Sequence, residues 1–85
     1  MTQPDRITAT PDPVHPGGNL EVCYNFTGTG LSQAKLTLDY GDAIPDDSGT
    51  VTPANPCKTF KVPTNAVGDI IISAPQSQDH GVTIS

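Results

Sequence analysis

The stretch Leu20-Glu21-Val22-Cys23-Tyr24-Asn25-Phe26 predicts the fold of this chain. Its even-numbered residues are aliphatic or aromatic, and its odd-numbered residues are glutamate, cysteine and asparagine. Successive side chains of a β-strand point to opposite faces, so a period of two is typical of a strand with one buried face. We interpret the stretch as the central strand of a small sandwich, whose other segments cover its apolar face.

The remainder of the chain contains further short strand candidates, separated by turn-forming residues. These candidates are 7–10, 34–40, 50–52, 57–62, 67–74 and 82–84. Nine prolines and eight glycines suit frequent turns, and together the segments indicate an all-β, antiparallel two-sheet sandwich of about seven short strands. Disorder is the competing interpretation because the hydrophobic content is low. The repeated alternation argues against it.

The run Ile70-Ile71-Ile72 is the longest continuous aliphatic run in the sequence. Strands that are buried on both faces have such runs, whereas half-buried strands alternate. We therefore expect this strand to be covered on both sides or to lie in the centre of its sheet.

The length of 85 residues indicates a single domain. We expect a flexible N-terminal arm over residues 1–6 and one β-sandwich domain over residues 7–85. Only 34% of the residues are hydrophobic and none is tryptophan, so the core alone supplies about 3–5 kcal/mol. A disulfide between Cys23 and Cys57 would add roughly 3–4 kcal/mol by restricting the unfolded chain. The alternative is two reduced cysteines buried as small apolar side chains.

Four segments carry a resemblance to known modules: the lead-in Pro11–Gly18, the strand 20–26, the strand Leu36–Tyr40, and the strand with Phe60 and Val62. Over residues 5–85 their order resembles immunoglobulin-like and fibronectin type III-like modules, which are frequent in secreted and cell-surface proteins. The resemblance implies a two-sheet sandwich whose second and fifth strands are neighbours.

The cysteines depart from the immunoglobulin pattern, in which an inward disulfide packs against a tryptophan. By alternation, Cys23 and Cys57 lie on the faces opposite the apolar side chains. In a fibronectin-like order their strands pair within one sheet, so we predict a within-sheet disulfide on an outer face. Disulfides persist in oxidising compartments, so we expect an extracellular, cell-surface or periplasmic location. The polar start Met1-Thr2-Gln3-Pro4 does not have the apolar core of a signal peptide, which argues against export.

Four basic residues against nine acidic residues give a net charge of −5. Nucleic acid is a poor partner for such a surface, because phosphate binding requires clustered lysine and arginine. Anionic lipid is disfavoured for the same reason. No apolar run approaches the length that spans a bilayer, so we expect no membrane insertion.

An acidic segment is the main candidate site. Its carboxylates are Asp39, Asp42, Asp46 and Asp47. Calcium prefers several carboxylate and carbonyl oxygens, so these four residues are a candidate calcium site, although the spacing differs from the twelve-residue calcium loop and solvated loop carboxylates are commoner. Tyr40, Asp42, Asp46 and Asp47 are also the candidate binding residues, because the other aromatic rings are needed for the core. We expect no other cofactor.

Other chemistry has weaker signals. His15 and His80 would need two further ligands for a zinc site. We find no paired acid and base and no Gly-x-Ser-x-Gly motif, and so expect no enzyme. Asn25-Phe26-Thr27 matches the N-glycosylation acceptor motif.

Two functions fit these observations. The first is an extracellular binding or adhesion module that contacts a protein, or less favourably a glycan, through loops at one end of the sandwich. We expect residues 41–49 and 27–32 to form that end. The second is a structural spacer or assembly subunit that contacts neighbouring modules. A small secreted effector that acts through an exposed loop is a third interpretation.

Overall fold

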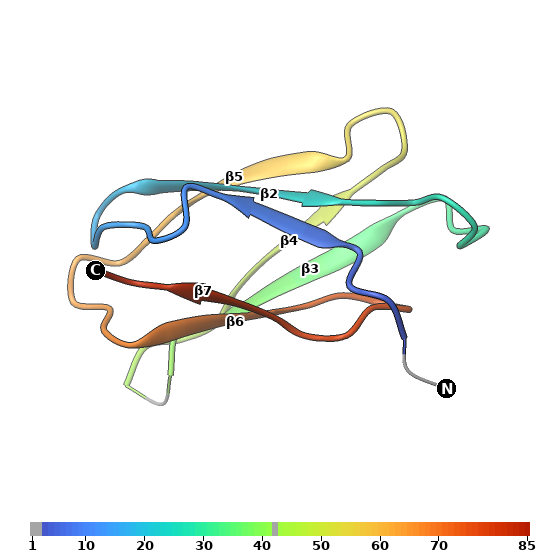
Figure 1. The fold of residues 1–85 in the computed structure, drawn as a ribbon. Coiled ribbons are helices and arrows are strands. Elements are labelled where there is room, and N and C mark those ends of the chain that lie inside the picture. Colours follow the sequence, from blue (N-terminus) through green and yellow to red (C-terminus); the bar gives the residue numbers. More distant parts are fainter. Residues whose placement is uncertain (1–2, 42) are drawn as a thin grey trace.

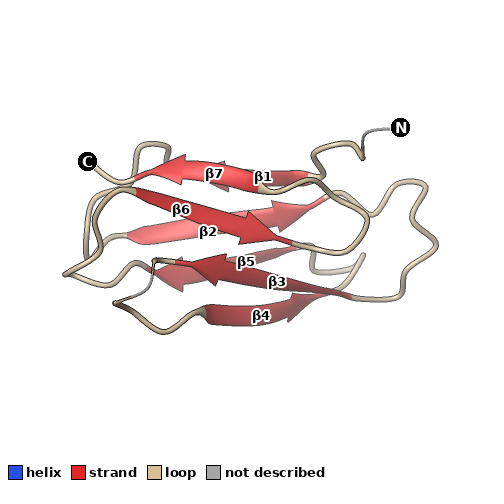
Figure 2. Cartoon of the chain, turned by 90° about the horizontal axis from the view of Figure 1, so that it is seen from below, coloured by secondary structure: helices blue, strands red, loops and turns tan. Residues whose placement is uncertain are grey.

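The computed structural model describes residues 3–41 and 43–85, and it consists of seven strands in two sheets, with no helix in the described residues (Figures 1 and 2). The strands are β1 (Ile7–Thr10), β2 (Asn19–Tyr24), β3 (Ala34–Asp39), β4 (Asp47–Val51), β5 (Cys57–Lys61), β6 (Asp69–Ser73) and β7 (His80–Thr83). All neighbouring strands pair antiparallel. The predicted all-β, two-sheet class is confirmed.

The three-stranded sheet has the order β1-β2-β5, and the four-stranded sheet has the order β4-β3-β6-β7. The two sheets lie face to face, as the views in Figures 1 and 2 show. The predicted pairing of the second and fifth strands is confirmed. The start of β1 and the C-terminus lie at opposite ends of the sandwich (Figure 1).

The core lies between the two sheets and is built from alternating residues of both. Leu20, Val22 and Tyr24 of β2 are buried, as are Leu36 and Leu38 of β3. Each fully buried aliphatic side chain stabilises the fold by about 1.5–3 kcal/mol. The apolar face predicted for the stretch 20–26 is therefore the buried face, and Phe26 packs at its edge, with its ring centroid 4.8 Å from that of Tyr24.

The lead-in segment between β1 and β2 closes one side of the sandwich. Val14 is buried and forms a parallel bridge with Ile84, just beyond β7. The Val14 amide donates to the Thr83 carbonyl at 2.9 Å, and the Ser85 amide donates to the Val14 carbonyl at 3.0 Å. The proline-rich segment thus joins the edges of the two sheets, in agreement with the expected edge position.

The opposite side of the sandwich is flanked by the edge strands β4 and β5. Lys58 lies on the same face of β5 as the buried Phe60, and its aliphatic stem extends over Gly49 of β4. A Cβ at Gly49 would lie 2.3 Å from Cδ of Lys58, so the glycine provides the space for this stem. Inward-pointing lysines are a known protection of edge strands against pairing with other chains.

Two strand expectations need correction. β4 begins at Asp47, three residues before the expected strand 50–52, because Asp47, Ser48 and Gly49 pair with β3. These residues have low β-propensity, so the ladder with β3 determines their conformation. In β6, Ile70 and Ile72 are buried but Ile71 is 39% exposed. The central position of β6 is confirmed, whereas burial on both sides is wrong because nothing among the described residues covers the outer face.

Cys23 and Cys57 form a disulfide and are directly opposite one another in the β2–β5 ladder. Cys57 is exposed and Cys23 is half-buried, on the outer face of the three-stranded sheet. The predicted within-sheet disulfide is confirmed. A disulfide of this kind is compatible with an oxidising compartment.

We predict that the Cys23→Ser/Cys57→Ser variant retains the fold but loses about 3–4 kcal/mol of unfolding free energy, because the disulfide closes a loop with a sequence separation of 34 residues. Urea unfolding of the two proteins, with circular dichroism for the fold, measures the difference. Thr59→Ser, on the same outer face, is the matched control. Equal unfolding free energies for the double variant and the native chain would contradict the stapling role.

Candidate functional site

The loops gather at the two ends of the sandwich (Figure 1). One end, which we name the amide end, carries residues 4–6 and the loops 25–33, 52–56 and 74–79. The other end, which we name the acidic end, carries residues 11–18, 40–41, 43–46 and 62–68 and the C-terminus.

The expected joint binding surface of residues 41–49 and 27–32 is wrong. Residues 27–32 precede β3 and residues 43–46 follow it, so the length of β3 separates the two segments (Figure 1). The two segments are close in the sequence because they flank the same strand, but a strand places its two flanking loops at opposite ends of the sheet. A binding site at one end can contain only one of them.

The acidic residues do not come together as a calcium site in the described part of the chain. Asp39 accepts a hydrogen bond from the Gly41 amide at 2.8 Å, and Asp47 accepts one from the adjacent Ser48 amide at 2.8 Å. Asp46 is exposed, and Asp42 lies outside the described residues. Asp39, Asp46 and Asp47 form no group of converging ligand atoms, so calcium binding stays a prediction without geometric support.

Tyr40 is buried, with 4% of its surface exposed, and its ring belongs to the core. The expectation that this ring is free to stack on a ligand is therefore wrong. Its hydroxyl is buried without a hydrogen-bond partner among the described residues. Burial, with a smaller contribution from the negative charge of Asp47, raises the pKa of Tyr40 to about 12.

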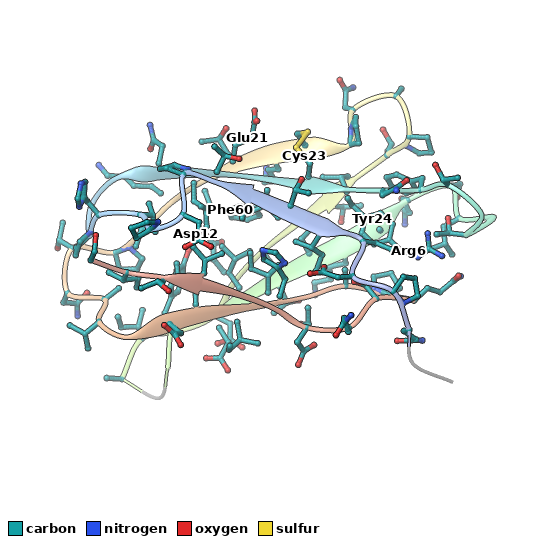
Figure 3. The ribbon with its side chains drawn as sticks, in the orientation of Figure 1. Arg6, Asp12, Glu21, Cys23, Tyr24 and Phe60 are labelled. Atoms are coloured by element: carbon teal, nitrogen blue, oxygen red, sulfur yellow. A yellow bond between two sulfur atoms is a disulfide. The ribbon has the colours of Figure 1, made fainter. Side chains whose placement is uncertain are left out.

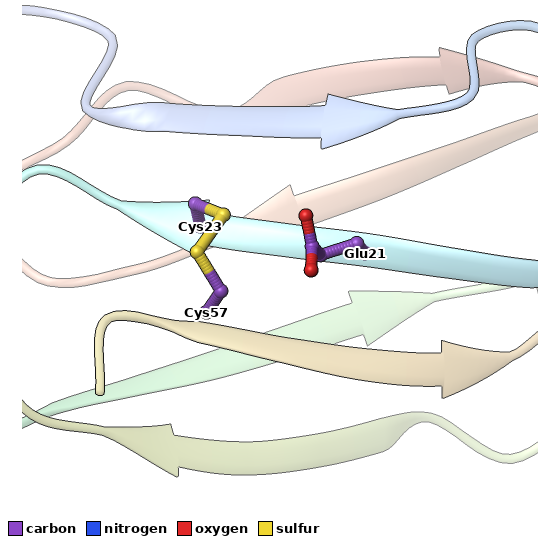
Figure 4. Close-up of side chains that lie close together, drawn as sticks. All are labelled: Glu21, Cys23 and Cys57. Atoms are coloured by element: carbon purple, nitrogen blue, oxygen red, sulfur yellow. A yellow bond between two sulfur atoms is a disulfide. The ribbon is translucent and has the colours of Figure 1, made fainter.

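Among the described residues, the only group of three metal-ligand side chains is Glu21, Cys23 and Cys57 (Figure 4). Both sulfur atoms are joined in the disulfide, and thiolates rather than disulfides bind metals. The two histidines are also separate. The His15 Nδ1 lies 3.0 Å from the Ser85 carbonyl at the acidic end, whereas His80 begins β7 at the amide end.

Arg6 organises the amide end (Figure 3). Its guanidinium donates to three backbone carbonyl oxygens in two loops. The acceptors are Gln76, at 3.0 Å from Nε, Thr27, at 2.6 Å from Nη1, and Asn25, at 3.4 Å from Nη1. A planar guanidinium can hold several acceptors in a fixed geometry. One side chain therefore ties residues 25–27 to residue 76.

Further polar side chains add links between the same two loops. Gln76 donates from Nε2 to the Thr29 carbonyl at 3.1 Å. The Thr29 hydroxyl donates to the Phe26 carbonyl at 2.8 Å, and the Ser77 hydroxyl accepts from the Arg6 amide at 3.0 Å. Thr29 and Ser77 are the buried polar residues of the described chain. Buried groups that are hydrogen-bonded in this way order the backbone around them.

Asp5 joins the N-terminal residues to β7. Its Oδ2 lies 2.6 Å from Nδ1 of His80, and its Oδ1 accepts from the Ile7 amide at 3.0 Å. Burial acts to raise the pKa of Asp5, but the hydrogen bonds from His80 and Ile7 outweigh it and hold the pKa below its usual value. The Pro4 carbonyl accepts from the Gln78 amide at 3.1 Å.

The residues that order the amide end lie partly in the segment expected to be a flexible arm. Pro4, Asp5 and Arg6 are hydrogen-bonded to residues 76–80. Flexibility of the arm stays a prediction for Met1 and Thr2, which lie outside the described residues. No sequence pattern marks the role of Arg6, because its acceptors are backbone carbonyl groups that any residue carries.

Comparisons with known proteins find no matching protein family, curated protein or solved structure. The described residues contain no pocket, and no helix in them is long and apolar enough to span a membrane. The candidate site is therefore described from its own residues alone. The exposed residues of the amide end include two carboxylates, Asp5 and Asp79, and a set of amides and hydroxyls: Asn25, Thr27, Ser32, Gln33, Asn55 and Gln78.

We predict that Arg6→Ala loosens both loops, because three backbone carbonyl groups lose their donor. Charged hydrogen bonds contribute about 1.5–3 kcal/mol when buried. Because Arg6 is only half-buried, we expect a loss of about 1 kcal/mol in unfolding free energy after screening by solvent. Amide hydrogen exchange should become faster in residues 25–31 and 75–78.

Arg6→Lys should resemble Arg6→Ala in this experiment, since an ammonium cannot hold three carbonyl groups in the same geometry. Lys61→Ala is the control, because Lys61 is exposed on β5. Unchanged exchange in both loops of Arg6→Ala would show that Arg6 does not order them.

We predict that Asp5 makes stability depend on acid pH. A carboxyl whose pKa is lower in the folded chain stabilises the fold above its unfolded pKa, and this contribution is lost as pH falls through the folded value. The unfolding free energy should therefore decrease below about pH 4, and Asp5→Asn should flatten this decrease. Denaturant unfolding between neutral and acid pH measures it. An equal effect of Asp46→Asn, at the other end, would contradict the assignment.

Proposed function

We propose that this chain is a non-catalytic binding module of the immunoglobulin-like or fibronectin type III-like kind, and that its amide end contacts a protein partner. The observation that carries the proposal is the Arg6 network, in which one guanidinium ties residues 25–27 to Gln76. Both loops also pack on the core through Phe26 and Ala74, and the Arg6 hydrogen bonds add order beyond this packing. Loops that are ordered in this way are suited to binding a partner.

Ordering before binding raises affinity because less conformational entropy is lost in the complex. The amide end has two features of such a surface. Its backbone is held by buried polar contacts of Thr29 and Ser77, and its exposed side chains at Gln33 and Gln78 are uncharged hydrogen-bonding groups. This combination suits polar contacts with a protein surface.

A protein partner is favoured over a glycan by the aromatic residues. Sugar-binding surfaces commonly use exposed aromatic rings. Here Tyr24, Tyr40 and Phe60 are buried and Phe26 packs against the core. The amide end therefore offers hydrogen bonds but no exposed aromatic ring among its described residues.

The proposed location is extracellular, cell-surface or periplasmic. The disulfide Cys23–Cys57 supports it, because disulfides persist in oxidising compartments and its sulfur atoms lie on an outer face accessible to reductants.

A spacer or assembly subunit is the second candidate function. The observation in its favour is that the start of β1 and the C-terminus lie at opposite ends of a molecule measuring 37 × 28 × 21 Å (Figure 1). Modules with this arrangement can be joined end to end. Small-angle scattering of two tandem copies tests this function, since a spacer gives an extended pair and a flexible linker gives a broad distribution.

The binding function is tested with a displayed random peptide library as the probe. The protein is immobilised through its C-terminus, which leaves the amide end free, and selected peptides are measured by calorimetry. Gln33→Ala/Gln78→Ala should weaken binding about tenfold or more if both side chains contact the peptide. Asp46→Ala/Asn65→Ala, at the acidic end, is the matched control. Selection of no peptide, or peptides sensitive only to the control variant, would overturn the proposal.

A further inference from the structure

The outer face of the three-stranded sheet carries three metal-ligand side chains on two neighbouring strands. Glu21 and Cys23 point outward from β2, because the intervening Val22 is buried. Cys57 of β5 is directly opposite Cys23 in the ladder. A carboxylate oxygen and the two sulfur atoms lie within 4.8 Å of one another (Figure 4). The group is therefore compact, although its sulfur atoms are joined as a disulfide.

The disulfide is accessible to a reductant, since Cys57 is exposed and Cys23 is half-buried. A thiolate of a dithiol can attack Sγ of Cys57 to form a mixed disulfide, and Cys23 leaves as a thiolate. The second thiol of the reductant then displaces Cys57 and departs as its own disulfide. Two electrons and two protons pass from the reductant to the chain, which then carries two thiols side by side.

We propose that the reduced chain binds one zinc ion through Cys23, Cys57 and Glu21, with water as the fourth ligand. Zinc binds thiolates and carboxylates in a tetrahedral geometry and has no redox chemistry that would oxidise the thiols. Binding displaces the protons of both thiols. Calcium and magnesium prefer oxygen ligands and do not suit two sulfur atoms. The site thus has two states, a disulfide in the oxidised chain and a zinc site in the reduced chain.

The strand pairing places the two sulfur atoms within reach of one ion. In a tetrahedral site with zinc–sulfur distances of about 2.3 Å, the sulfur atoms lie roughly 3.8 Å apart. The Cα atoms of Cys23 and Cys57 are 4.0 Å apart, and rotation about the Cα–Cβ bonds separates the sulfur atoms to the required distance. The backbone can stay in place, because the β2–β5 ladder extends over five residue pairs, from Asn19–Lys61 to Cys23–Cys57.

The neighbours of Glu21 leave its carboxylate free to bind the ion. Glu21 is flanked in the two ladders by Thr10 and Thr59, whose short side chains leave room for an ion and a water molecule above the sheet. The one ion pair between described residues lies elsewhere, at Asp5 and His80. The net charge of −5 also favours a cation as the ligand.

Zinc would replace the disulfide as the link between β2 and β5. Because zinc binds the folded chain, it would restore part of the stability that reduction removes. The zinc site does not depend on the proposed binding function, since its ligands are on β2 and β5 rather than in the loops of the amide end.

Zinc titration of the reduced chain tests the proposal. The native chain is reduced with a phosphine, which is removed under nitrogen, and zinc binding is measured by calorimetry. The reduced chain should bind one zinc ion per chain about a hundredfold or more tightly than Cys23→Ser/Cys57→Ser, which lacks both thiolates. The oxidised native chain should bind zinc no more tightly than this variant.

Glu21→Gln should weaken zinc binding to the reduced chain about tenfold or more, because a neutral amide is a poorer ligand than a carboxylate. Asp69→Asn, the same change on the other sheet, is the matched control and should leave the zinc affinity unchanged. Saturating zinc should raise the melting temperature of the reduced native chain by about 5 °C or more, because the folded chain holds the ion.

Equal zinc affinities of the reduced native chain and the double serine variant would overturn the proposal, as would equal affinities of Glu21→Gln and Asp69→Asn. One zinc ion per two chains would contradict the three-ligand site, because the thiolates of two chains would then hold the ion. Tight binding without a rise in melting temperature would also contradict it, since the ion would then bind the unfolded chain.

Discussion

Burial of the alternating apolar faces of β2 and β3 is the interaction on which this structure depends. Leu20 and Val22 on one sheet face Leu36 and Leu38 on the other, and all four are excluded from water. Because the hydrophobic fraction of the chain is only 34%, the core has few side chains to spare. Tyr24, Tyr40 and Phe60 are also buried in this core, so none of these three rings is exposed on the surface.

The two open sides of this thin core are closed by different means. The Val14–Ile84 bridge joins the sheets on the β1–β7 side. The stem of Lys58 lies across Gly49 on the β4–β5 side. The disulfide links β2 to β5 on the outer face and leaves the interior to aliphatic residues.

The two ends of the sandwich can differ in chemistry because most of their loop residues lie outside the core. At the amide end, Arg6 and the buried hydroxyls of Thr29 and Ser77 add hydrogen bonds to loops whose Phe26 and Ala74 pack against the core. At the acidic end, the carboxylates of Asp39 and Asp47 bond to adjacent backbone amides rather than to a shared ligand. This additional order is the reason for proposing that the amide end binds a partner.

The sequence by itself determined the all-β class, the buried face of β2 and the outward position of Cys23 and Cys57, because these follow from strict alternation along single strands. Only the tertiary structure decided the start of β4, the exposure of Ile71 and the hydrogen bonds of Arg6. Each of these depends on which segments become neighbours across the sheets or at one end. Alternation specifies the face on which a side chain lies, whereas its partners depend on strand order and register, which are set by contacts between distant residues.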